Sequence, residues 1–388
     1  MNQLSLQPPR LLIISYTNAG EDPRVLRQVL ALRETFTLIL AALDAPALEK
    51  VTFHRIRRQR KSLLAQGWIA ANLLAGNFGP AQRRFSLQHP GVALAQDFDL
   101  VLVNDAEPLP LAFRLAKGKP VVFDAHEYYP REMESSWRWR LLFQKYLTRL
   151  CADYIPRCAA MITVSDGIAQ EYEKEFGVRP EVIMNGPKYH GLPVVPCHDE
   201  TVRLIHHGSA NPDRNLEQLI ELADYLDSRF TLTFMLVGDA RYITDLKKLS
   251  DANPKIIWRD PVPMQDISKE INLYDLGVYL APPTNFNTNF MLPNKFFEFI
   301  QARLGVAIGP SPEMQRLVEA YQLGVVAKNF TPQSLAAGLN SLTSEKIQAF
   351  KQNAAKAAEE LTAEAGMRKL TDILLGVLAG AETSGRQG

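Results

Sequence analysis

The chain has 388 residues, of which 46% are hydrophobic and 22% are charged. This composition is that of a folded globular protein and not of a disordered chain, and the length is sufficient for two domains. The 43 Lys and Arg residues nearly balance the 42 Asp and Glu residues, which argues against a nucleic-acid-binding protein. Three cysteines are too few for a disulfide framework, and we identify neither a signal peptide nor a transmembrane segment, so we expect a cytoplasmic protein.

Short apolar runs alternate with amphipathic helical stretches along the first half of the chain. We predict strands there at 10–15, 36–41, 100–103, 120–124 and 161–164. A Pro- and Gly-rich stretch up to residue 200 is typical of a linker between domains. A second series follows it, with strands predicted at 202–206, 231–237, 256–258, 277–281 and 306–308. Further helices are predicted over about 24–34, 344–361 and 367–378. The alternation predicts an α/β fold in two halves, each a parallel sheet covered by helices on both faces.

The loop after the first strand contains two candidates for contact with a ligand, Asn18 and Gly20. Ligands of doubly wound sheets bind beyond the carboxyl ends of the strands, and a glycine lets a ligand approach the backbone closely. A plain turn between strand and helix accounts for the same residues. The loop lacks the G-x-G-x-x-G pattern of dinucleotide-binding proteins.

Polar residues also follow the strands predicted at 100–103 and 120–124, and we expect them to meet in one cleft. They are Asp105, Asp124, His126 and Glu127. A carboxylate there can act as a base, and a histidine can donate to a sugar hydroxyl or stabilise a phosphate. The structural alternative is helix capping by the aspartates and a hydrogen-bonded core histidine.

The second half contains a candidate anion site after its first strand. Gly208 and Ser209 offer backbone N–H groups there, and Arg214 offers a fixed charge for a diphosphate. An exposed arginine at the start of a helix is the alternative.

The segment from Pro293 to Glu298 carries the most chemical information. Pro293 favours the first position of a helix, and the N–H groups after it, near Asn294, form an anion site to which Lys295 adds a positive charge. Glu298 lies one turn further on, in an otherwise apolar helix, where a buried carboxylate requires partners. We interpret it as a ligand for a ribose diol; the alternative is an ion pair with Lys295.

Residues 51–96 contain seven Lys and Arg residues and no Asp or Glu, interleaved with Leu and Trp. Together with a second segment at 137–140 they form a predicted platform, whose members are Arg55, Arg57, Arg58, Arg60, Lys61, Trp68, Trp137 and Trp139. Basic residues beside Trp and Leu suit an anionic membrane surface or a lipid-linked acceptor. A solvated basic face that binds a polar acceptor is the alternative, and the balanced net charge disfavours nucleic acid.

Six segments resemble, in their order and spacing, motifs of the GT-B glycosyltransferases of family 4, a large retaining group. They are 22–25 (DPRV), 123–127 (FDAHE), 180–186 (PEVIMNG), 236–239 (LVGD), 274–282 (YDLGVYLAP) and 293–298 (PNKFFE). The resemblance implies two Rossmann-like domains that face each other across a cleft. The N-terminal, acceptor-binding domain would span 1–190, the C-terminal, nucleotide-sugar-binding domain 196–364, and a last helix within about 365–388 would cross back to the N-terminal domain.

The resemblance also implies the transfer of a sugar from a nucleotide-diphosphate sugar to a glycan or lipid-linked acceptor, with retention of configuration. Residues Gly238 and Asp239 would then help to hold the base, Arg214 and Lys295 the diphosphate, and Glu298 the ribose. We expect no metal and no other cofactor, because the only Asp-x-Asp, at 97–99, precedes a strand at the end away from the cleft. An enzyme attached to the inner face of the cell membrane, in bacterial surface polysaccharide or glycolipid synthesis, is the expected setting.

In the first domain, the resemblance implies that His126 lies near the transferred sugar. If the enzyme inverts configuration, Asp105, Glu127 or His126 is the candidate base. One position departs from the family: Phe290 stands where the first glutamate of an E-x7-E motif is expected. Two alternative functions therefore stay open, a non-catalytic nucleotide-sugar-binding subunit of a glycan assembly complex and a non-hydrolysing nucleotide-sugar epimerase.

Overall fold

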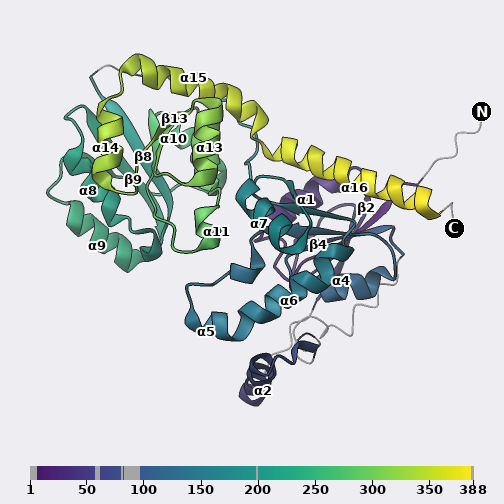
Figure 1. The fold of residues 1–388 in the computed structure, drawn as a ribbon. Helices are drawn as coiled ribbons and strands as arrows, with labels where there is room; N and C mark the ends of the chain where they lie inside the picture. Colours follow the sequence, from purple (N-terminus) through teal and green to yellow (C-terminus); the bar gives the residue numbers. More distant parts are fainter. Residues whose placement is uncertain (1–6, 57–61, 80–81, 83–96, 198–199, 386–388) are drawn as a thin grey trace, which may run out of the picture. The chain divides into compact units, whose positions relative to one another are not determined.

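A computed structural model of the chain describes residues 7–56, 62–79, 82, 97–197 and 200–385, with the side chains of 382–385 left out. The chain forms two compact units (Figure 1). The N-terminal unit consists of Met1–Met184, Asn285–Asn287 and Gly366–Gly388, and the C-terminal unit of Asn185–Thr284 and Thr288–Ala365. Nothing in the sequence predicts that the three residues at 285–287 are part of the N-terminal unit.

Within the described residues, seven parallel strands form the sheet of the N-terminal unit, in the order β3-β2-β1-β4-β5-β6-β7. The strands are β1 (Arg10–Ile14), β2 (Thr37–Ala42), β3 (Val51–Arg55), β4 (Leu100–Asn104), β5 (Val121–Ala125), β6 (Ala160–Thr163) and β7 (Glu181–Val182). The five predicted strands are confirmed, whereas β3 and β7 are not predicted. Both are edge strands, one half-exposed and the other only two residues long.

The helices of this unit include one from the far end of the chain. They are α1 (Pro23–Leu32), α2 (Leu63–Leu74), α4 (Leu109–Ala116), η1 (Tyr129–Arg131), α5 (Trp137–Trp139), η2 (Arg140–Gln144, a π-helical turn), α6 (Lys145–Tyr154), η3 (Ile155–Arg157), α7 (Asp166–Phe176) and α16 (Ala363–Gly385). Helix α16, yellow in Figure 1, buries Leu370 and Leu374 completely in the core that β1 and β2 share with α1. The N-terminal unit therefore has a core built from both ends of the chain.

Six parallel strands form the sheet described in the C-terminal unit, in the order β10-β9-β8-β11-β12-β13. The strands are β8 (Val202–Ala210), β9 (Phe230–Gly238), β10 (Ile256–Trp258), β11 (Leu276–Tyr279), β12 (Gly305–Ile308) and β13 (Gly324–Val326). All five predicted strands are present, and the three-residue edge strand β13 is the addition. The other elements are η4 (Pro212–Arg214), α8 (Glu217–Tyr225), α9 (Ala240–Ser250), η5 (Met264–Asp266), α10 (Ile267–Ile271), α11 (Phe286–Asn289, shared by both units), α12 (Asn294–Gln301), α13 (Pro312–Tyr321), α14 (Pro332–Asn340) and α15 (Ser344–Glu360).

Both sheets reverse their strand order at one point, between β1 and β4 in the N-terminal unit and between β8 and β11 in the C-terminal unit. Ligands of doubly wound sheets bind beyond the carboxyl ends of the strands at such a point, and the predicted site residues follow these strands. The predicted α/β class with two Rossmann-like domains is thus confirmed. No helix in the described part of the chain is both long and apolar enough to cross a bilayer.

Candidate functional site

A pocket of about 590 Å3 lies in the C-terminal unit beyond the carboxyl ends of β8 and β9. The predicted donor-site residues that line it are Gly208, Ser209, Arg214, Pro293, Asn294, Lys295 and Glu298. The predicted base-holding residues Gly238 and Asp239 are not among its lining residues. Asp239 instead caps α9, where its carboxylate accepts the N–H groups of Arg241 and Tyr242 at 2.9 and 3.1 Å.

Lys295 is almost fully buried in this pocket, with 5% of its surface exposed. Its Nζ lies 3.1 Å from Nε2 of His206 and over the ring of Tyr279, 5.4 Å from the centroid. A Cβ atom at residue 208 would approach Nζ to 3.5 Å, and residue 208 has φ of +102°, so a glycine suits both the backbone and the space beside Lys295. Burial lowers the pKa of Lys295 to about 7, and Arg214 adds to this effect while Glu298 opposes it.

The carboxylate of Glu298 has no hydrogen-bond donor among the described residues, although its side chain is only 15% exposed. Burial raises its pKa to about 7, against the attraction of Lys295. The nearest partner is Nε2 of His207 at 3.5 Å, but burial and Lys295 lower the pKa of His207 to about 3, so this histidine is neutral. The direct ion pair with Lys295 that the sequence left open is not formed. The carboxylate therefore lines the pocket with its hydrogen-bonding capacity unused.

The start of α12 adds a third cationic element to the pocket. Pro293 is the N-cap of this helix and not its first residue as predicted, because its backbone is extended, with φ of −70° and ψ of 145°. No side chain caps the helix, so its positive end faces the pocket without an internal anion. Arg214 also has no carboxylate within ion-pair distance among the residues that the structure describes. Lys295, Arg214 and the helix N-terminus thus surround one pocket with groups that suit an anion such as a diphosphate.

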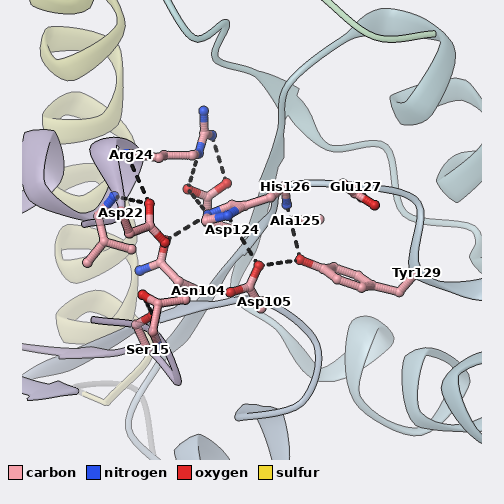
Figure 2. Close-up of polar contacts among 12 residues, drawn as sticks. Ser15, Asp22, Arg24, Asn104, Asp105, Asp124, Ala125, His126, Glu127 and Tyr129 are labelled. Carbon is pink, nitrogen blue, oxygen red and sulfur yellow. Dashed lines mark hydrogen bonds and ion pairs between the residues drawn. The ribbon is translucent and has the colours of Figure 1, made fainter. Parts of the chain in front are cut away.

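In the N-terminal unit, His126 lies between two aspartates at the carboxyl ends of β4 and β5 (Figure 2). Its Nδ1 is 3.2 Å from Asp105 and its Nε2 is 3.6 Å from Asp124, while Asn104 Oδ1 is 3.1 Å from Nε2. Burial lowers the pKa of His126, but the two carboxylates outweigh it and the net shift is upward. The structure thus brings together Asp105, Asp124 and His126, as predicted from the strand ends.

Asp124 does not face a cleft, as the sequence suggests, but is completely buried. Arg24 donates two hydrogen bonds of 2.7 Å to its carboxylate (Figure 2). Gln28 donates a third, of 2.5 Å. Burial would raise the pKa of Asp124, but Arg24 and His126 hold it well below its usual range. Asp124 is therefore a buried counter-charge close to His126, 3.6 Å from its Nε2. Arg24 and Gln28, which hold Asp124, are site residues that the sequence did not reveal.

Asp105, the second aspartate beside His126, is held by Tyr129 and not by Arg24 and Gln28. It has φ of +69°, a conformation that few residues other than glycine adopt, and it accepts a 2.5 Å hydrogen bond from the hydroxyl of Tyr129. The charge around it is negative: burial and the nearby Glu127, Glu107 and Asp105 raise the pKa of Glu132 to about 7. Burial and Asp105 also raise the pKa of Glu127. This site is acidic, in contrast to the cationic pocket of the C-terminal unit.

The first loop forms a turn in which the side chain of Asn18 accepts the N–H of Gly20 at 3.1 Å. Their predicted contact with an acceptor stays a prediction. The Asp-x-Asp at 97–99 lies at the amino end of β4, where Asp97 pairs with Lys119 and Asp99 accepts the N–H of Arg10 at 2.7 Å. In the part of the chain that is described, no cluster of His, Cys, Asp and Glu is arranged to hold a metal.

The predicted platform is only partly described, because Arg57, Arg58, Arg60 and Lys61 lie outside the described residues. Trp137 is 62% exposed and Trp68 is 46% exposed. Trp139 is buried, so its inclusion in an exposed platform is wrong; two residues after Trp137, it faces the opposite side of α5. Arg55 pairs with Asp44 at 2.5 Å, which neutralises part of its charge.

Two comparisons with known proteins show what the chain resembles. A model of Glycosyltransferase Family 4 matches residues 47–187, which lie mainly in the N-terminal unit. Solved structures that match nearly the whole chain are glycosyltransferases of the GT-B fold. The resemblance to GT-B glycosyltransferases of family 4 is confirmed.

Three solved structures illustrate the likeness. HepE from Anabaena, in complex with UDP, is 15% identical, covers 95% of this chain and 100% of its own, and has a TM-score of 0.66. Sucrose-phosphate synthase from Thermosynechococcus elongatus is 11% identical over 96% of this chain and 100% of its own, with a TM-score of 0.68. The lipopolysaccharide outer core galactosyltransferase WaaB is 10% identical over 95% and 99%, with a TM-score of 0.63. At these identities the likeness establishes the GT-B fold alone. No curated protein sequence matches the chain.

Proposed function

We propose that the protein transfers a sugar from a nucleotide-diphosphate sugar to a glycan or lipid-linked acceptor, without a metal or other cofactor. One observation carries the proposal: the pocket of the C-terminal unit combines cations for a diphosphate with a carboxylate that has no internal donor. A ribose diol offers two O–H donors to Glu298, and a diphosphate offers acceptors to Lys295 and Arg214.

The same groups would promote departure of the nucleoside diphosphate. Negative charge grows on the diphosphate as the bond to the sugar breaks, and Lys295, Arg214 and the N-terminus of α12, which line the pocket, would stabilise that charge. We propose the N-terminal unit as the acceptor-binding domain, with His126 acting on the transferred sugar and Asp105 or Glu127 as alternative bases. Retention of configuration is proposed from the family resemblance.

A nucleotide panel tests the donor site. UDP is the first candidate because crystals of HepE contain it, and GDP, ADP and CMP complete the panel. Thermal unfolding should show stabilisation of the wild type by one nucleotide, with a loss of that stabilisation in the Glu298→Ala variant. An Asp245→Ala variant, which removes an exposed carboxylate on α9 outside the pocket, serves as the matched control. If no nucleotide stabilises the wild type, the proposed function is refuted.

A second candidate function, a non-catalytic nucleotide-sugar-binding subunit, is favoured by Phe290, which occupies the place of a family glutamate. Such a protein would bind nucleotide but would neither hydrolyse nor transfer the sugar. Incubation of the protein with the nucleotide sugar that stabilises it, followed by measurement of released nucleotide with and without acceptor extracts, separates the two functions.

We also propose that the protein is cytoplasmic and that helix α2 binds an anionic membrane surface, where a lipid-linked acceptor would be found. The twelve residues of α2 include no charged side chain, and the helix exposes 85% of Leu63 and 88% of Leu64 to solvent. It packs against η2, on whose outer side Arg140 and Leu141 are exposed. Apolar side chains beside arginines complement anionic lipid headgroups above an apolar interior.

Vesicle sedimentation tests the membrane proposal. The wild type should bind vesicles that contain phosphatidylglycerol more strongly than neutral vesicles, and added salt should weaken this binding. A Leu63→Ser/Leu64→Ser variant should bind several-fold less, whereas Leu249→Ser, which changes an exposed leucine on α9, should not differ from the wild type. Equal binding of all three proteins would refute the proposal.

A further inference from the structure

A buried histidine, His206, contacts the pocket-lining Lys295 but does not itself line the pocket. It lies on β8, next to the pocket-lining His207, and only 1% of its surface is exposed. One ring nitrogen, Nδ1, lies 2.8 Å from the carbonyl oxygen of Val278 on the neighbouring strand β11. The other, Nε2, lies 3.1 Å from Nζ of Lys295.

These two contacts fix the tautomer of His206. A carbonyl oxygen can only accept, so Nδ1 must carry the proton that it donates to Val278. The neutral ring then has a lone pair on Nε2, and this atom accepts a hydrogen bond from Lys295. Burial and the neighbouring Lys295 push the pKa of His206 well below its usual value, so the ring stays neutral and keeps this lone pair at physiological pH.

We infer that His206 is a positioning residue, which holds the amino group of Lys295 at the diphosphate subsite by accepting one of its hydrogen bonds. The inference rests on the proposed function, since it assumes that Lys295 contacts a diphosphate. An ammonium group has three donors, and His206 takes one of them, so two are left to point at a ligand. The face of Tyr279 supports the same position of Nζ, 5.4 Å from the ring centroid.

A flexible lysine side chain would otherwise lose much of its conformational freedom when a ligand binds. A fixed Nζ removes that cost from the binding step, which is the advantage of preorganisation. The charged and titratable groups that face Lys295 are His206 and His207 on β8, Arg214 after β8, Tyr279 on β11 and Glu298 on α12. Arg214 disfavours the charged lysine and Glu298 favours it.

Two substitutions of the histidine separate its two hydrogen bonds. In the His206→Asn variant, the shorter amide can still donate to Val278, but it cannot reach Lys295. In the His206→Gln variant, the amide extends to the position of Nε2 and can accept from Lys295. We therefore expect His206→Asn to weaken UDP binding about tenfold, which corresponds to one hydrogen bond, and His206→Gln to restore most of the affinity.

The experiment is titration calorimetry of UDP, GDP and ADP between pH 6 and 9, with uridine as a control that lacks phosphate. The pH at which nucleotide affinity begins to fall should be lower for His206→Asn than for the wild type, because a lost acceptor destabilises the charged lysine. In a Lys295→Met background, replacement of His206 should have little further effect on affinity. A purely structural role would not produce this coupling or shift the pH midpoint.

The possible results are distinguishable. If no nucleotide binds the folded wild type, the proposed function and this inference are both wrong. If a nucleotide binds, but His206→Asn has the affinity and pH midpoint of the wild type, only the inference is wrong. Equal losses in the wild-type and Lys295→Met backgrounds would likewise overturn it, since His206 would then act by another route.

Discussion

Replacement of Glu298 by glutamine should stabilise the nucleotide-free protein against unfolding and should weaken nucleotide binding. Burial raises the pKa of this carboxyl from 4.5 to about 7. At pH 8 the carboxylate is ionised in both the native and the unfolded chain, and its burial then destabilises the native state by about 3 kcal/mol. The neutral amide of glutamine does not carry this cost.

The sign of the effect depends on pH. Below about pH 4.5, Glu298 is protonated in both the native and the unfolded state, so its burial adds no charge penalty. Between about pH 4.5 and 7 it ionises in the unfolded chain but stays protonated in the native state, and the free energy of unfolding falls as the pH rises. The Glu298→Gln variant should therefore match the wild type near pH 4.5 and exceed it by up to about 3 kcal/mol at pH 8. In a folding unit of this size, that difference raises Tm by roughly 6–12 °C.

The binding side of the prediction has the opposite sign. Hydrogen bonds to a charged acceptor contribute about 1.5–3 kcal/mol each, so the loss of the carboxylate should weaken UDP binding by about 100-fold. Differential scanning calorimetry at pH 4.5 and 8, with and without UDP, measures both effects. The reasoning fails if Glu298→Gln unfolds at the wild-type temperature at both pH values and binds UDP with the wild-type affinity.

Three further predictions concern other parts of the chain. Asp124→Asn removes one partner of a buried ion pair and should destabilise the protein by about 3–5 kcal/mol in urea unfolding at pH 7, because Arg24 is left buried without its counter-charge. Arg214→Ala should weaken UDP binding by about tenfold and leave uridine binding unchanged in calorimetry; equal losses for both would show that Arg214 does not contact phosphate. Gly277→Ala would place a Cβ atom 2.2 Å from the ring of Phe299 and should destabilise the protein by about 1–3 kcal/mol, whereas an unchanged urea midpoint would contradict the packing.

The strands that the sequence predicts are those with a strong local signal. The central strands of both sheets are continuous apolar runs because they are buried on both faces. Strand β3 (VTFHR) has histidine and arginine in its last two places and lies at an edge, so its apolar pattern is too short to recognise. Strand β13 has only three residues and depends on its pairing with β12.

Among the candidate site residues, those that are close in the sequence can be predicted to lie together, and those far apart in the sequence cannot. Lys295 and Glu298 lie one turn apart on one helix, so their proximity follows from helical geometry and the sequence predicts it. Arg24 and Asp124 are 100 residues apart, and His206 and Lys295 are 89 residues apart. These pairs form only through the tertiary fold, and no local pattern of one sequence specifies them.

The N-terminal unit is built from both ends of the chain, and this affects the order in which the two units fold during synthesis. Residues up to Met184 leave the ribosome roughly 180 residues before the segment of α16 that completes their core. Synthesis proceeds at about 5–20 residues per second. The apolar surface that Leu370 and Leu374 cover in the finished protein therefore stays exposed for about 10–40 s. The C-terminal unit, whose strands and helices lie between these two parts, can fold during that interval. The first unit to be translated is therefore the last to become complete, and its core stays open for longer than that of the C-terminal unit.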